Sequence, residues 1–98
     1  MIDIVQLAAI AARHGLPAPD AIPVPWTGAT SRVYPLGDAV VKIPFDRPDA
    51  IAAVETDAAM ASFARNLGAR AAELIAFDEL RDIVPVPFVI FRRVEGAI

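Results

Sequence analysis

Apolar residues recur at every third or fourth position over residues 3–14, the spacing of one helix face, and this pattern predicts a first helix. Asp3 is the expected N-cap of that helix, and Gly15 is expected just past its last turn. A second, longer helix is predicted over residues 48–67, because that segment opens with a proline suited to the first helical position and runs into a glycine.

Short runs of apolar and β-branched residues outside these helices predict strands. Residues 32–36 and 39–43 flank the turn dipeptide Gly37-Asp38, so they are expected to form a hairpin. The other expected strands lie near residue 22, as a proline-flanked edge strand, and over residues 72–77 and 87–92. We therefore predict a single α+β domain over residues 1–98, an antiparallel sheet of about five strands with one long packed helix and a preceding N-terminal helix.

Composition fits one small domain and argues against several kinds of partner. Of the 98 residues, 56% are apolar and the mean hydropathy is +0.50, which reflects either abundant alanine or a face that something else covers. The net charge is −3 and the arginines are scattered, so nucleic acid is not an expected partner. The chain has no cysteine and its only histidine is His14, so no metal site is expected.

Nothing in the sequence predicts export or membrane insertion. The N-terminal segment carries an acid, Asp3, and no early positive charge, unlike a signal peptide. The longest apolar run, residues 83–91, contains two prolines and is far too short to cross a bilayer. The expected location is therefore the cytoplasm, with no membrane partner.

One strand carries an unusual charge. Lys42 is the only lysine of the chain and lies in an otherwise apolar strand, so its ammonium must either reach solvent on a wet face of the sheet or find a partner. Glu55 has Ile51, Ala58 and Ala59 as its helical neighbours, which predicts a carboxylate on a buried stripe, whereas Asp57 reads as an ordinary polar position. We expect Lys42 and Glu55 to pair, because each would otherwise be a costly buried charge.

These residues resemble a known family. The phrases at residues 33–38 (VYPLGD), 40–44 (VVKIP) and 89–96 (VIFRRVEG) are similar to the small lobe of protein-kinase-like phosphotransferases, in the aminoglycoside, macrolide and choline kinase branch. The resemblance spans about residues 20–98 and depends on the order and spacing of the phrases. It implies an ATP-dependent transfer of a phosphoryl group to a hydroxyl of a small molecule, such as an aminoglycoside- or macrolide-type acceptor.

The resemblance also implies a role for individual residues. Lys42 would contact the α- and β-phosphates of ATP, and Glu55 would orient it. The other implied nucleotide contacts are Gly28, Ala29, Thr30 and Ser31 in a loop over the phosphates, Val33, Val40 and Phe91 around the adenine, and the backbone of Arg92 to Val94 at the adenine edge. Only Gly28 matches the G-x-G-x-x-G pattern of protein kinases, which favours the small-molecule branch.

The family's catalytic aspartate, asparagine and Mg²⁺-binding aspartate belong to a second, larger lobe, and no match to them occurs in this sequence. We expect no phosphotransferase activity from the chain alone, weak nucleotide binding, Mg²⁺ binding only with the larger lobe, and an apolar face available to that lobe or to a second copy. Two alternatives remain open: a free-standing interaction or pseudokinase-like module, and an unrelated small α+β domain in which the ion pair is coincidental.

Overall fold

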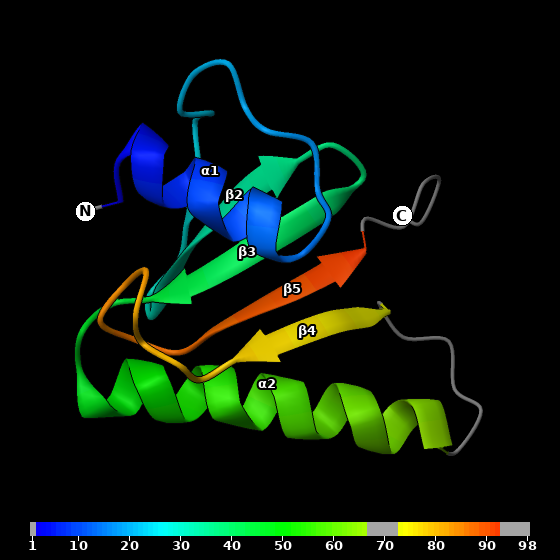
Figure 1. Ribbon diagram of the computed structural model, residues 1–98. Coiled ribbons are helices and arrows are strands. Elements are labelled where there is room, and N and C mark those ends of the chain that lie inside the picture. Colours follow the sequence, from blue (N-terminus) through cyan, green and yellow to red (C-terminus); the bar gives the residue numbers. More distant parts are fainter. Residues whose placement is uncertain (1, 67–72, 93–98) are drawn as a thin grey trace.

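The computed structural model describes residues 2–66 and 73–92, which form two helices and a five-stranded antiparallel sheet (Figure 1). The strands lie side by side in the order β1-β2-β3-β5-β4. The elements are α1 (Ile4–Arg13), β1 (Trp26–Thr27), β2 (Ser31–Leu36), β3 (Ala39–Pro44), α2 (Pro48–Asn66), β4 (Leu74–Asp78) and β5 (Phe88–Arg92). This confirms the predicted α+β class, the antiparallel sheet, the long helix and the preceding N-terminal helix.

Helix α1 has the two ends that its sequence predicts. The Asp3 carboxylate accepts a hydrogen bond from the backbone N–H of Gln6 at 2.8 Å, and the Gln6 side chain accepts one from the Asp3 N–H at 2.9 Å, which completes a capping box. At the other end Gly15 has φ +68°, and the N–H of Leu16 donates to the carbonyl of Ala11 at 2.8 Å. The helix therefore ends with the six-to-one hydrogen bond of a Schellman motif.

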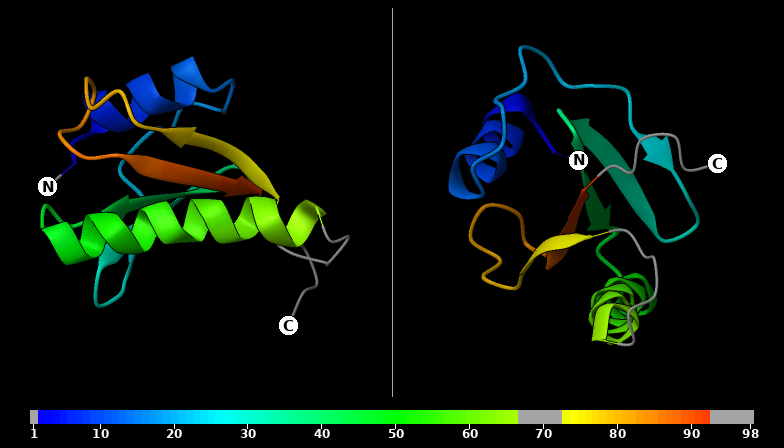
Figure 2. Two further views of the ribbon diagram at one scale, coloured as in Figure 1. Left: turned by 90° about the horizontal axis from the view of Figure 1, so that it is seen from below. Right: turned by 90° about the vertical axis from the view of Figure 1, so that its right-hand side faces the viewer.

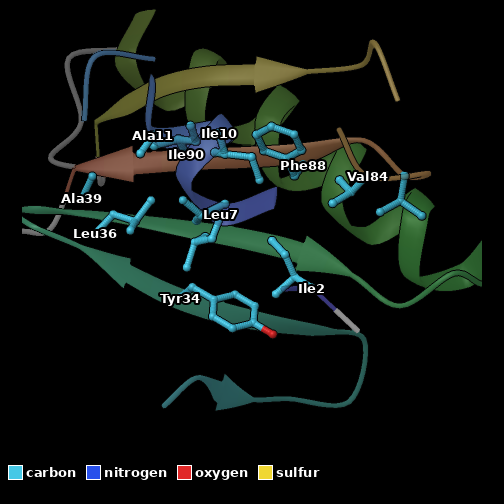
Figure 3. Close-up of a cluster of buried hydrophobic side chains, with 12 residues drawn as sticks. Ile2, Leu7, Ile10, Ala11, Tyr34, Leu36, Ala39, Val84, Phe88 and Ile90 are labelled. Carbon is cyan, nitrogen blue, oxygen red and sulfur yellow. The ribbon is translucent and has the colours of Figure 1, made fainter. Parts of the chain in front are cut away.

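Helix α1 covers one face of the sheet. Alternate residues of β2, β3 and β5 point toward it and form a continuous apolar core with Leu7, Ile10 and Ala11 (Figure 3). The strand residues of this core, all nearly fully buried, are Tyr34, Leu36, Ala39, Val41, Phe88 and Ile90. Among the described residues, this side therefore holds the larger of the two buried apolar clusters.

Helix α2 packs on the opposite face, and Figure 2 shows the two helices on either side of the sheet. Its buried residues Ala50, Val54 and Ala58 recur at every fourth position, and Val54 and Ala58 lie against Val89 of β5. Two of these three side chains are alanine, so the contact brings the helix close to the sheet with little apolar volume between them. Lys42 lies on the sheet beneath this helix.

The structure departs from the sequence-based expectations at two element boundaries. The edge strand expected near residue 22 is instead the two-residue strand β1, Trp26–Thr27, because Pro23 and Pro25 have no N–H with which to extend the ladder. The predicted end of the long helix at Leu67 lies outside the described residues, where α2 is described as far as Asn66. Neither helix of the described part is long and apolar enough to cross a membrane.

Candidate functional site

The predicted nucleotide-binding side chains of the sheet share one face. Val33 lies directly opposite Lys42, which in turn lies opposite Val89, and Val40 lies opposite Phe91. Directly opposed residues of antiparallel strands point to the same side of a sheet, so all five side chains face the side on which α2 packs. The structure therefore brings together Val33, Val40, Lys42 and Phe91, as the resemblance implies.

Lys42 forms an ion pair with helix α2, but not with the residue that we expected. Its ammonium donates to the carboxylate of Asp57, with Nζ and Oδ2 2.5 Å apart. The expected pairing with Glu55 is wrong, because Glu55 lies on the exposed side of the helix. A strand lysine and a helix acid are therefore paired, with the acid two residues later in the chain than expected.

The error has a physical reason in the composition of α2. The apolar neighbours Ile51, Ala58 and Ala59 predict that Glu55 lies on a buried stripe. Ala59 is nevertheless exposed, because alanine is tolerated on either side of a helix. The buried stripe is defined by Val54 and repeats at every fourth residue, and Asp57, three residues after Val54, lies at its edge. Centring the buried stripe on Val54, the one valine of the helix, would have found Asp57.

The Lys42–Asp57 pair is within reach of a ligand. The two side chains keep 28% and 37% of their surface exposed, so the pair lies at the border of the core instead of inside it. A half-exposed ion pair contributes only about 0–1 kcal/mol to stability. Stability alone therefore gives little reason to place the only lysine of the chain in an apolar strand.

The predicted phosphate loop is the turn that joins β1 to β2. The N–H of Gly28 donates to the Ser31 carbonyl at 2.9 Å, and the Thr30 carbonyl accepts from the Phe45 N–H at 2.9 Å. Within the described part of the chain, the structure gives no partner to the N–H groups of Ala29 and Thr30. The loop therefore offers two backbone donors, which is the property that an anion-binding turn requires.

Arg47 is a feature of the site that the sequence analysis missed. Its guanidinium donates to the Ala29 carbonyl at 2.9 Å and to the Asp49 carboxylate at 3.2 Å, and it lies over the Phe45 ring at 5.4 Å. Arg47 thereby fastens the β1–β2 turn to the first turn of α2. No local pattern identifies this contact, because Ala29 and Arg47 are 18 residues apart and meet only through the fold.

Of the predicted adenine edge, residues 92–94, the structure describes Arg92 alone. The N–H of Arg92 already donates to the Glu73 carbonyl at 2.8 Å, so it is not free to bind a base. The Arg92 side chain pairs with Glu73 at 2.7 Å and Asp38 at 3.1 Å, and the hydrogen bond and charge of Glu73 raise the pKa of the guanidinium. Val94, the other predicted edge residue, lies outside the described residues.

Comparisons of the chain with models of known protein families, with curated proteins and with solved structures find no match. Among the described residues, no group of three or more acidic or histidine side chains is placed to hold a metal ion.

The candidate site consists of three parts: the Lys42–Asp57 pair, the β1–β2 turn that Arg47 holds, and the small apolar surface of Val33, Val40 and Phe91.

Proposed function

We propose that this chain is the nucleotide-binding small lobe of an ATP-dependent small-molecule phosphotransferase. In this proposal the ammonium of Lys42 contacts the α- and β-phosphates, and Asp57, not Glu55, holds the ammonium in place. The single observation that carries the proposal is this ion pair between the third strand and the helix that follows it. In the kinase-like fold the corresponding strand lysine pairs with an acid of the helix after that strand.

The arrangement of the strands supports the same interpretation. Ser31, at the end of the β1–β2 turn, pairs with Pro44, which follows Lys42 by two residues on β3. Lys42 therefore lies close to this turn. The turn offers the Ala29 and Thr30 N–H groups, and Lys42 offers one full positive charge. Backbone donors and an ammonium close together on one side of a sheet suit a polyphosphate better than a neutral ligand.

An adenine would lie against the apolar surface further along the same face. Val40 lies two residues from Lys42 on β3 and directly opposite Phe91, and both side chains are partly exposed. This surface touches only one side of a base, so most of the affinity must come from the phosphates. We therefore propose that ATP binds weakly to the chain by itself, and that phosphoryl transfer requires a second lobe to supply the metal ligands and the catalytic base.

The test is a titration of the ¹⁵N-labelled chain with ATP, followed by NMR chemical shifts, and repeated with adenosine and with tripolyphosphate. We expect saturable shifts at Ala29, Thr30 and Lys42 with ATP and tripolyphosphate, with a dissociation constant in the millimolar range. Adenosine should give much smaller shifts. Lys42→Met should weaken ATP binding about tenfold, the effect of losing one charge-assisted contact.

Two acids of α2 provide a matched comparison. Asp57→Asn should weaken ATP binding a few-fold, because the ammonium loses the carboxylate that orients it, while Glu55→Gln should leave binding unchanged. If Lys42→Met binds ATP as well as the parent chain, the proposal is wrong. A free-standing interaction module would then be the better interpretation of the fold.

A further inference from the structure

The side of the sheet opposite to Lys42 carries a hollow. It is a cleft of about 190 Å³ between the start of α1, the start of β2, the end of β3 and the segment that leads into β5. Ile2, Tyr34, Val84 and Val86, all at most 7% exposed, form its apolar lining. An apolar cavity of about 150 Å³ holds one benzene molecule, so this cleft has room for a ligand with a single ring.

One buried tyrosine presents a hydroxyl to this cleft. Tyr34 is 3% exposed, and Figure 3 shows its hydroxyl on the side of the ring away from Leu36, at the end of the cluster where Ile2 lies. Within the described residues the hydroxyl has no hydrogen-bond partner. No fully buried polar side-chain atom of those residues lacks a partner, so this oxygen must reach the open space of the cleft.

Arg32 also lines the cleft and has no acidic partner. Its guanidinium lies over the ring of Phe45, 5.3 Å from the ring centroid, and no carboxylate of the described residues is within 4.0 Å of it. Stacking on an aromatic ring fixes the plane of a guanidinium and leaves its N–H groups free at the edge. Arg32 therefore presents unpaired guanidinium N–H groups beside an apolar hollow.

Asp46 is the one acid of the lining, and it is placed differently from Arg32. It is exposed to solvent, whereas Arg32 is half-buried, and the two are not paired. A charge that is shielded from water acts more strongly on a ligand in the cleft than a charge that water surrounds. The positive charge of Arg32 therefore outweighs the negative charge of Asp46, and the cleft favours an anion. Asp46 lowers the affinity for that anion.

We propose that this cleft binds a small organic monocarboxylate with an aromatic or branched apolar body. The apolar body lies against Ile2, Val84 and Val86, the carboxylate accepts two hydrogen bonds from Arg32, and the Tyr34 hydroxyl donates to the same group. The site does not depend on the nucleotide proposal, because Arg32 and Tyr34 belong to the α1 side of the sheet and Lys42 to the α2 side.

The proposal is tested with benzoate as the probe and benzamide as its neutral isostere. Methyl NMR of the intact chain, labelled at Ile and Val, should show saturable shifts of Ile2, Val84 and Val86 with benzoate, in the millimolar range, and about tenfold weaker binding of benzamide. Arg32→Gln should weaken benzoate binding at least about tenfold, whereas Arg81→Gln, which removes an exposed arginine outside the cleft, should not change it.

Two further variants keep the proposal falsifiable if Arg32→Gln does not fold. Tyr34→Phe retains the buried ring and should weaken benzoate binding a few-fold, and Asp46→Asn should strengthen it about twofold by removing the opposing charge. The proposal is overturned if benzoate causes no saturable methyl shifts, or if Arg32→Gln folds and binds it normally. It is also overturned if Asp46→Asn weakens binding, because removal of an opposing charge must strengthen the binding of an anion.

Discussion

Gly15 and Gly37 adopt positive φ values, +68° and +63°, but their surroundings differ. A Cβ atom added at Gly15 would meet no atom within 4 Å. A Cβ atom at Gly37 would lie 2.6 Å from Cγ of Pro17, in the segment that connects α1 to the sheet. Gly37 therefore serves two purposes: it turns the β2–β3 hairpin, and it lets that segment pack against the turn.

This difference predicts unequal effects of the same substitution. Gly15→Ala should cost about 1–2 kcal/mol of folding free energy, the price of a left-handed conformation for a residue with a side chain. Gly37→Ala should cost more than Gly15→Ala, because Pro17 must also move. Urea denaturation of both variants measures the difference directly. Equal losses of stability would show that Pro17 yields without cost.

At the scale of single residues, the sequence predicts backbone conformations better than side-chain contacts. The turn dipeptide Gly37-Asp38 and the capping residue Asp3 were both predictable, because local backbone geometry restricts which residues can occupy such positions. The acid that pairs with Lys42 was not predicted correctly. In an alanine-rich helix, neighbouring residues barely distinguish the buried side from the exposed side, so Glu55 and Asp57 could be told apart only from the packing of Val54.

A small charged cluster joins helix α1 to β4 and to the segment that follows β4. The carboxylate of Asp78, with 3% of its side chain exposed, accepts hydrogen bonds from Arg13 at 3.1 Å, from the Leu80 N–H at 3.0 Å and from His14 at 3.1 Å. Arg13 also pairs with both carboxylate oxygens of Asp82. These contacts join the last turn of α1 to the end of β4 and to the segment after it.

The cluster predicts a loss of stability in acid. Burial alone would raise the pKa of Asp78, but hydrogen bonds from Leu80, Arg13 and His14 lower it overall. The hydrogen bond from Arg13 lowers the pKa of Asp82 to about 2, from an ordinary value of 3.8. A carboxylate whose pKa is lowered by folding stabilises the fold fully above its unfolded pKa, and this contribution is lost as the pH falls through the folded value.

Urea midpoints measured from pH 6 down to pH 2 test this prediction. The parent chain should lose stability below about pH 4, and Asp82→Asn should lose less over the same interval. Asp78→Asn should cost about 1–3 kcal/mol at pH 6, the usual effect of removing a buried charged acceptor from its hydrogen-bond donors. Asp49→Asn, at an exposed pair with Arg47, serves as a control with little effect. An acid transition unchanged in Asp82→Asn would contradict the assignment.

At the scale of elements, the class and order of the helices and strands followed from periodicity and turn residues alone. The docking of those elements did not. The ring of His14, for example, contacts Asp78 and lies edge-on to Phe88, 6.0 Å between centroids. Such contacts join residues about 65 positions apart, and no local pattern encodes them. The same limit explains why Arg47 was missed.

At the scale of the whole molecule, the described residues form two unequal apolar cores, one on each side of the sheet. The α1 side is filled with large side chains such as Leu7, Ile10 and Phe88. Helix α2 contributes Val54 and Ala58 to the second core, and its Ile51 packs against the first. Strand β5 belongs to both cores, through Phe88 and Ile90 on one side and Val89 on the other. Helix α2, which carries Asp57, is therefore held by the smaller share of buried apolar surface.

This asymmetry predicts that α2 separates from the sheet more readily than the sheet itself unfolds. Amide hydrogen exchange followed by NMR should be slowest in β3 and β5 and faster in α2. Val54→Ala removes about two methylene equivalents, worth about 1–2 kcal/mol, and should accelerate exchange in α2 roughly tenfold with a smaller effect on β5. Glu55→Gln, on the exposed side of the same helix, should leave the rates unchanged. If Val54→Ala accelerates β5 as much as α2, the domain opens only as one unit, and the Lys42–Asp57 pair is then as stable as the fold itself.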